Sequence, residues 1–197
     1  MNVIFMGTPD FAVPVLESII NSDKHKVVAV VTQPDRPVGR KAVVTPPPVK
    51  VAAAAHGLPI FQFEKIRLGG AETLKSLNAD IMVTCAYGQI LSQEIIDICK
   101  YGIINVHASL LPKYRGAAPI QYAVINGESK TGVTFMKTSA GLDTGDIIAE
   151  YETAIGKNET AGELAERLSL LGAEHIRQIL TAIENGSATF TPQNDET

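Results

Sequence analysis

Cysteine, tryptophan and long apolar runs are scarce in this sequence, and each scarcity excludes a class of protein. The 197 residues include two cysteines and no tryptophan. Cys85 and Cys99 lie inside apolar segments without the spacing of metal ligands, so we expect buried, reduced thiols, no metal and a cytoplasmic protein. Apolar stretches such as residues 26–32 are far shorter than the roughly 20 residues that span a bilayer. A strand-like run begins at residue 2, so we expect neither a membrane segment nor a signal peptide.

The overall charge is mildly acidic and gives no general attraction to nucleic acid. The formal net charge is −4, so any contact with nucleic acid needs a local basic patch. With 45% hydrophobic residues, the chain can bury a sizeable core, which indicates one globular domain.

Short apolar runs alternate with helical patterns along the chain. Expected strands are residues 2–6, 26–32, 59–61, 80–85, 102–106, 132–138 and 146–155. Expected helices are residues 11–20, 48–57, 71–78, 92–100 and 160–185, with an N-cap at Ser92, a stop at Gly57 and a capping box starting at Thr160. Continuous apolar runs are typical of strands covered on both faces. We therefore predict an α/β fold, doubly wound around a mostly parallel open sheet, with helices on both faces.

The end of the chain becomes polar after residue 186. We expect one domain over residues 1–189 and the start of a linker at residues 190–197.

In such a sheet, ligands bind outside the carboxyl ends of the strands. The turn after the first strand, residues 7–11, lacks the glycine pattern of a nucleotide-binding loop. Thr8 and Asp10 could cap the following helix instead, and the sequence leaves both interpretations open.

A long loop, residues 33–50, follows the second strand and is locally basic. It carries Arg36, Arg40, Lys41 and Lys50 against the single acid Asp35. Loops of this length are commonly functional, so the loop could follow a phosphate backbone, or its charges could simply be solvated.

Candidate catalytic side chains follow the fifth strand. Strand residues alternate faces, so Asn105 and His107 project on the same side. An Asn amide can donate to a developing oxyanion, and a His can donate or transfer a proton. A single His at a strand end is often only structural. Ser109 could bond to the backbone or act as a nucleophile.

The last loop, residues 139–148, supplies a carboxylate. Gly141 and Gly145 permit tight turns around Asp143, and the loop lacks the ligand series of a calcium site. If Asp143 faces His107, its charge favours the imidazolium form.

Several motifs together carry a resemblance to a known family. They are FMGTPDFAVPVLESI, QPDRPVGR, AYGQIL, INVHASLLPKYRGAAPIQYAVINGE and TGVTFMKTSAGLDTGDII. Taken in order they cover nearly the whole chain, which resembles the catalytic domain of the methionyl-tRNA formyltransferase family, within the wider family of enzymes that use 10-formyltetrahydrofolate. The resemblance implies a Rossmann-like formyltransferase fold, transfer of a formyl group to methionyl initiator tRNA in translation initiation, and a C-terminal OB-like domain beyond the linker.

The resemblance also implies a role for particular residues. The catalytic trio would be Asn105, His107 and Asp143. The folate donor would bind to Ala86, Tyr87, Gly88, Gln89, Ile90, Leu91, Ser109, Leu110, Leu111, Pro112, Ala140, Gly141 and Leu142. The tRNA would contact Gly7, Thr8, Arg36, Arg40, Lys41 and Arg115. We expect a monomer with no membrane partner.

Two alternatives remain from the sequence. One is another enzyme of 10-formyltetrahydrofolate, either a transferase for a small amine such as glycinamide ribonucleotide or an amino-sugar nucleotide, or a hydrolase of the donor. The other is a nucleotide- or RNA-binding Rossmann module without catalysis.

Overall fold

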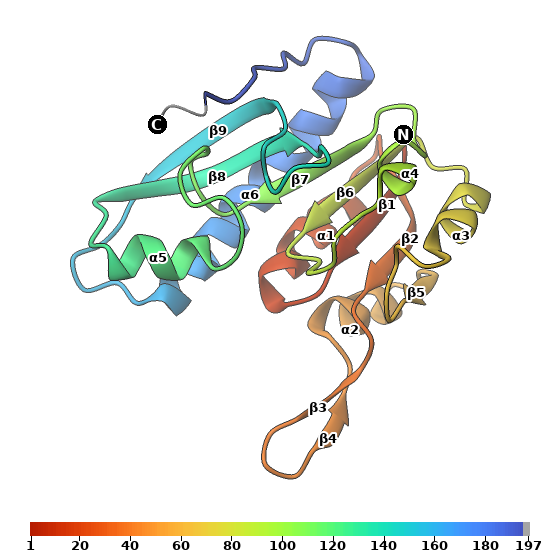
Figure 1. Cartoon of the computed structure of the whole chain (residues 1–197), viewed down its shortest axis with the longest axis horizontal. Coiled ribbons are helices and arrows are strands. Elements are labelled where there is room, and N and C mark those ends of the chain that lie inside the picture. Colours follow the sequence, from red (N-terminus) through yellow and green to blue (C-terminus); the bar gives the residue numbers. More distant parts are fainter. Residues whose placement is uncertain (195–197) are drawn as a thin grey trace.

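A seven-stranded open sheet organises the computed structural model, which describes residues 1–194 (Figure 1). The strand order is β5-β2-β1-β6-β7-β8-β9. The parallel strands are β1 (Asn2–Gly7), β2 (Lys26–Thr32), β5 (Ile60–Gln62), β6 (Ile81–Cys85) and β7 (Ile103–His107). Two antiparallel strands, β8 (Lys130–Lys137) and β9 (Ile147–Ala154), complete the sheet. The predicted mostly parallel doubly wound sheet is confirmed.

Helices cover both faces of the sheet, so its central strands are buried and continuously apolar. One face packs against η1 (Asp10–Ala12), α1 (Val13–Ile20), α2 (Pro48–Ala55) and the long α6 (Ala161–Glu184). The other face packs against the shorter α3 (Gly70–Ser76) and α4 (Gln93–Ile96). The remaining helix, α5 (Pro119–Ile125), lies beside α6.

The expected elements agree with the structure except in a few places. The capping box at Thr160 is present, and Gly57 follows α2 with a positive φ of 64°. The helix expected at 92–100 is shorter, and Ser92 occupies its N-cap position without a side-chain bond. The sequence did not predict α5.

The chain reverses its direction of travel across the sheet at β1. From β1 it winds outward through β2 to β5, and then returns to β6 on the other side of β1. This switch point places the ends of β1 and β6 side by side, with Gly7 opposite Cys85. Ligands of open α/β sheets bind at such a crevice.

The basic segment after β2 is a β-hairpin rather than an irregular loop. The strands β3 (Arg36–Val38) and β4 (Val43–Thr45) pair only with each other and project from the body as an arm (Figure 1). Their side chains are exposed, so no burial pattern marks these strands in the sequence. Lys50 belongs to α2 and not to the arm.

The segment after α6 returns along the sheet. Thr191 pairs with Ile147 at the start of β9 through two backbone hydrogen bonds. The domain boundary at residue 189 stays a prediction, and the last part of the expected linker, 195–197, lies outside the described residues. Within residues 1–194 no helix is long and apolar enough to cross a membrane.

Candidate active site

The end of β7 presents two polar side chains on one face of the sheet. Ile104 and Val106 pack into the core beneath α6, so Asn105 and His107 project from the opposite face. The His107 side chain is 7% exposed. The alternation predicted from the sequence is present in the structure.

Asp143 joins these two side chains into one cluster. Its Oδ1 accepts a hydrogen bond from Asn105 Nδ2 at 3.2 Å, and its Oδ2 lies 3.6 Å from His107 Nδ1. The backbone N–H of Gly116 also donates to Oδ2, at 2.8 Å. The structure therefore brings together the three residues that the resemblance assigns to catalysis.

The surroundings of His107 fix where its protons lie. Nε2 is 2.9 Å from the carbonyl oxygen of Tyr114, which can only accept, so Nε2 carries a hydrogen. The proton that His107 can gain or lose is consequently on Nδ1, facing Asp143. The 3.6 Å separation of Nδ1 from Asp143 Oδ2 is longer than a hydrogen bond.

Thr84, which the sequence reasoning missed, orients the Asn105 amide. The carboxylate of Asp143 only accepts, so the nitrogen of Asn105 must face it and the oxygen must point away. The Thr84 hydroxyl donates to that oxygen at 2.9 Å. Thr84 lies within the apolar run of β6, where it looks like any β-branched strand residue.

The loop after β6, residues 86–91, begins two positions after Thr84, the partner of Asn105. Ala86 and Gly88 have positive φ values of 47° and 83°. The Tyr87 side chain is buried in the core, and burial raises its pKa to about 12. Tyr87 therefore offers only its backbone to a ligand, while the Ile90 side chain is 77% exposed.

Side-chain amides and one hydroxyl hold this loop. Thr8 Oγ1 donates to the Tyr87 carbonyl at 2.9 Å, so Thr8 does not cap a helix. Gln33 Nε2 donates to the carbonyls of Tyr87 and Gly88, and Gln89 Nε2 donates to Gln33 Oε1. Asp10 makes no side-chain cap either, and Pro14 lies in the first turn of α1.

The loop after β7 also lies at the site. Ser109 Oγ donates to the Lys113 carbonyl at 2.6 Å, so the expected backbone bond is confirmed. The peptide bond between Leu111 and Pro112 is cis, and Leu111 is buried. Leu110 lies against Gly132, since a Cβ there would be 2.5 Å from Leu110 Cδ2.

The loop that carries Asp143 completes the border. Leu142 is 69% exposed, and a Cβ on Gly116 would lie 3.1 Å from its Cδ2. Its neighbours Ala140 and Gly141 are exposed as well. The assignment of these loops to the folate donor stays a prediction.

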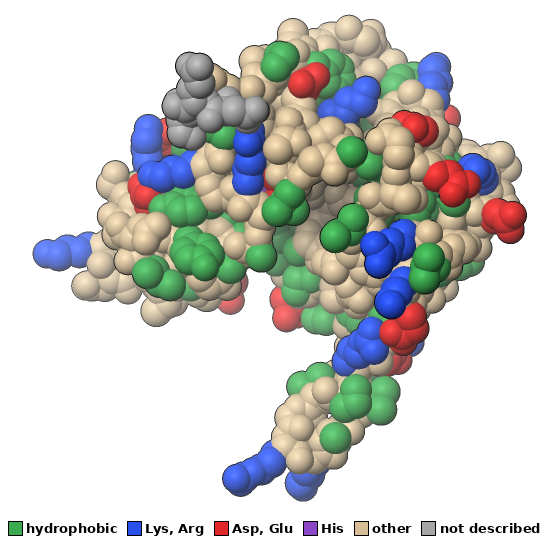
Figure 2. Space-filling model, in the orientation of Figure 1, with side chains coloured by type: hydrophobic (Ala, Val, Ile, Leu, Met, Phe, Trp, Pro, Cys, Tyr) green, Lys and Arg blue, Asp and Glu red, His purple; other side chains and the backbone are tan. Residues whose placement is uncertain are grey.

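The residues expected to contact tRNA are not gathered in one place. Arg40 and Lys41 lie exposed at the tip of the arm, where Figure 2 shows basic side chains far from the body. Arg36 pairs with Glu64 at 2.8 Å near the base of the arm. Arg115 lies at the site, where it bonds to Gln193 Oε1 at 2.9 Å.

Lys50 does not belong to the exposed basic surface. Its Nζ donates to both oxygens of Asp35 at 2.8 Å and to Gln62. These bonds, first that from Lys50, hold the pKa of Asp35 below its usual value. Lys50 therefore neutralises Asp35 at the base of the arm.

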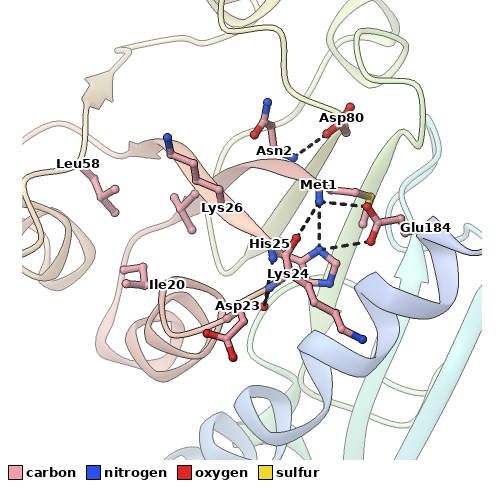
Figure 3. A pocket seen from close by; sticks show the side chains of 12 residues that line it. Met1, Asn2, Ile20, Asp23, Lys24, His25, Lys26, Leu58, Asp80 and Glu184 are labelled. Atoms are coloured by element: carbon pink, nitrogen blue, oxygen red, sulfur yellow. Dashed lines mark hydrogen bonds and ion pairs between the residues drawn. The ribbon is translucent and has the colours of Figure 1, made fainter.

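A separate pocket of about 540 Å³ lies at the amino ends of the parallel strands, opposite their carboxyl ends (Figure 3). The Met1 ammonium contacts Glu184 Oε1 at 3.2 Å and His25 Nδ1 at 3.4 Å. Asp80 accepts from the backbone N–H of Asn2 at 2.6 Å. These polar groups satisfy one another, which is the pattern of a structural cluster.

The two cysteines belong to the hydrophobic core. Both cysteines are buried and free, as predicted, and burial raises the pKa of Cys85 and brings that of Cys99 to about 11. In the described part of the chain, no group of His, Cys, Asp and Glu is arranged to hold a metal ion.

The chain is similar in sequence to known proteins. The formyl transferase family model matches residues 1–180. Methionyl-tRNA formyltransferases are similar in sequence: that of Agathobacter rectalis is 53% identical over the whole chain, and that of Alkaliphilus metalliredigens is 54% identical over 99% of it. The chain spans 63% and 62% of the length of these two relatives.

Solved structures share the fold. Glycinamide ribonucleotide transformylase 1 of Symbiobacterium toebii has a TM-score of 0.79 at 16% identity, with 98% of this chain and 94% of that one covered. An N-formyltransferase of Helicobacter canadensis, in complex with folinic acid and dTDP-3-aminofucose, has a TM-score of 0.74 at 24% identity, with 98% and 68% covered. The family model matches 180 of the 197 residues, which shows that the chain belongs to the formyl transferase family.

Proposed function

We propose that this chain transfers the formyl group of 10-formyltetrahydrofolate to the α-amine of methionyl initiator tRNA. The observation that carries the proposal is the convergence of Asn105, His107 and Asp143 at the end of β7. The identity of about half the residues to methionyl-tRNA formyltransferases supports the choice of acceptor. In translation initiation, such a protein acts in the cytoplasm, as a monomer.

The exposed surface around the trio fits a flat folate donor. Ile90 and Leu142 present apolar side chains on two loops that border the site. The strained backbone at Ala86 turns the 86–91 loop toward the crevice, where its N–H and C=O groups can bond to a ring edge. No protein group beyond these backbone and apolar contacts is required to hold the pterin, and no metal is part of the proposal.

Formyl transfer requires stabilisation of a negatively charged oxygen. When an amine attacks a formyl carbon, charge develops on the formyl oxygen before the bond to the donor nitrogen breaks. Asn105 Nδ2 uses one hydrogen for Asp143 and has a second to donate, and the imidazole of His107 is the second candidate donor. Loss of one such donor typically lowers kcat by about 10²–10³.

The Asp143 carboxylate is placed to transfer protons during the reaction. Its carboxylate lies between His107 and Asn105, and the Gly116 N–H fixes one of its oxygens. From this position it can pass a proton from the attacking amine to the leaving nitrogen, directly or through water. Ser109 is bonded to the backbone and takes no part.

The arm favours tRNA over a small amine as the acceptor. A hairpin with Arg40 and Lys41 at its tip has no role in binding a small molecule at β7, whereas it can reach the backbone of a long acceptor. A non-catalytic nucleotide-binding module would have no use for three polar side chains that converge in this way.

Release of tetrahydrofolate from 10-formyltetrahydrofolate tests the proposal. We expect turnover with methionyl initiator tRNA, little with glycinamide ribonucleotide or without acceptor, and a fall of at least about 10²-fold in His107→Ala. His56→Ala, at an exposed His that pairs with Glu17, is the matched control and keeps full activity. Turnover with the small amine alone would identify a different transferase, and unchanged activity in His107→Ala would remove the proposed mechanism.

A further inference from the structure

Gln193 reaches back from the end of the described chain into the candidate active site. Its Nε2 donates to the carbonyl oxygens of Asp143, at 2.9 Å, and Gly145, at 2.7 Å. Its Oε1 accepts from Arg115 Nε at 2.9 Å. One side-chain amide thus joins the loop of the catalytic carboxylate to the loop after β7.

The backbone around Gln193 is itself anchored. Thr191 and Ile147 exchange two backbone hydrogen bonds, at 2.8 and 2.9 Å, on the edge of the sheet. The ring of Phe190 lies under Lys137, with Nζ 5.7 Å from its centroid. Gln193 therefore approaches the site from a segment held against β9, and not from a freely moving tail.

The two ends of the Gln193 amide cannot be exchanged. The carbonyls of Asp143 and Gly145 only accept hydrogen bonds, and the Arg115 guanidinium only donates them. A glutamate here would still accept from Arg115, but it would place a carboxylate oxygen against two carbonyl oxygens. Only an amide of this length satisfies all three partners.

The loop that Gln193 holds has little regular structure of its own. Residues 138–146 join β8 to β9 without a helix or strand, and Asp143 has a positive φ of 50°. The placement of its carboxylate relative to His107 depends on the backbone at this residue. A misplacement of about 1 Å can lower the rate of an enzyme about 10²-fold.

We propose that Gln193 is a positioning residue, which sets the backbone of Asp143 and makes the geometry of the trio depend on the segment after α6. The proposal rests on the proposed function for its catalytic consequence. It extends that function by placing residues 190–194 within the catalytic unit. Tension or displacement applied to this segment then changes kcat without any contact to either substrate.

Steady-state kinetics of two variants test the catalytic part. With 10-formyltetrahydrofolate and methionyl initiator tRNA, we expect Gln193→Ala to lower kcat about 10-fold to 10²-fold while KM for either substrate changes less than about threefold. Gln193→Glu keeps an oxygen that accepts from Arg115 but loses the N–H groups that donate to Asp143 and Gly145. We therefore expect its kcat to be as low as that of Gln193→Ala. Gln178→Ala, at an exposed amide on α6, is the control and retains full kcat.

Three results would overturn the proposal. They are an unchanged kcat in Gln193→Ala, a change confined to KM, and recovery of kcat in Gln193→Glu, which would make the Arg115 contact the important one. Thermal unfolding of each variant within about 2 °C of the wild type shows that the fold is intact.

Amide hydrogen exchange separates this proposal from the proposed function, because it needs no substrate. The Gly116 N–H donates to Asp143 Oδ2, so its protection reports the position of that carboxylate. We expect protection at Gly116 to fall at least about 10-fold in Gln193→Ala while the amides of β1 are unchanged. Unaltered protection at Gly116 would contradict the proposal whatever the activity, whereas a loss of protection in a protein inactive on tRNA would refute only the function.

Discussion

Thr84 and Asn105 lie opposite each other on β6 and β7, and the Thr84 hydroxyl donates to the Asn105 side-chain oxygen at 2.9 Å. The pairing turns the amide nitrogen toward Asp143. A residue that never contacts the substrate in this arrangement thus determines which end of the amide is presented.

Replacement of Thr84 by Val tests this relationship. The change keeps the shape but removes the donor, so the Asn105 oxygen loses a hydrogen bond worth about 1 kcal/mol. We expect kcat to fall about fivefold to 10-fold with little change in KM, measured by release of tetrahydrofolate. Thr84→Ser keeps the hydroxyl and should remain near wild type. Equal losses in both variants would mean that packing of the methyl group, and not the hydrogen bond, matters.

The tip of the arm gives a prediction about salt dependence. We expect Arg40→Ala and Lys41→Ala to raise KM for tRNA severalfold and to leave kcat unchanged, because both side chains lie far from the trio. Each lost phosphate contact also makes the dependence of affinity on salt shallower, by about one unit of log–log slope. Lys157→Ala, at an exposed lysine outside the arm, is the control. An unchanged salt slope would show that the arm does not contact phosphate.

Gly145 gives a steric test of the loop that carries Asp143. A Cβ there would lie 1.7 Å from the carbonyl oxygen of Lys137, so the main chain must move in Gly145→Ala. We expect a fall of about 10²-fold in kcat and a loss of about 1–3 kcal/mol in the free energy of urea unfolding. A Cβ on Gly156 would lie 3.4 Å from Glu159 Cβ, an ordinary contact, so Gly156→Ala should change neither kcat nor the free energy of unfolding. Wild-type activity in Gly145→Ala would show that the loop position is not critical.

His25, which lines the pocket at the amino ends of the strands, gives a prediction about stability in mild acid. Burial, and next the nearby Met1 ammonium, lower the pKa of His25 from 6.5, while Glu184 opposes and Lys24 assists the shift. As pH falls through 6.5, the unfolded chain binds a proton that folded His25 does not, so the folded state loses stability. The slope from one such group is at most about 1.4 kcal/mol per pH unit.

Urea unfolding between pH 7.5 and pH 5 in His25→Gln checks this prediction. The glutamine can still donate to Thr181, the partner of His25 Nε2 at 3.1 Å, and it does not titrate. We expect a shallower decline of stability with falling pH than in the wild type. Parallel curves for the wild type and His25→Gln would contradict the assignment to His25.

The sequence predicts the sheet well because burial leaves a clear pattern. Strands such as β6 are buried at every position, and their continuous apolar runs appear in the sequence with nearly correct bounds. The arm and α5 lack this signal, since β3 and β4 are fully exposed and α5 spans only Pro119–Ile125. Exposed or very short elements have no periodic burial to detect.

The residues of the candidate site also differ in how well the sequence predicts them. Asn105 and His107 are predictable because strand alternation places them on one face, whereas Asp143 is joined to them through the family resemblance. Gln33 and Gln193 are not predictable, since each acts through an amide that bonds to backbone carbonyls from a distant segment. Such contacts depend on the completed fold and not on spacing along the chain.

The isolation of the arm makes it an exchangeable module. The strands β3 and β4 share no hydrogen bonds with the main sheet, and β2 and α2 hold the two ends of the insertion in the body. A hairpin of another length or charge can therefore be grafted between them without altering the strand order that builds the trio. Under the proposed function, this separation would let acceptor choice and formyl chemistry be engineered independently of each other.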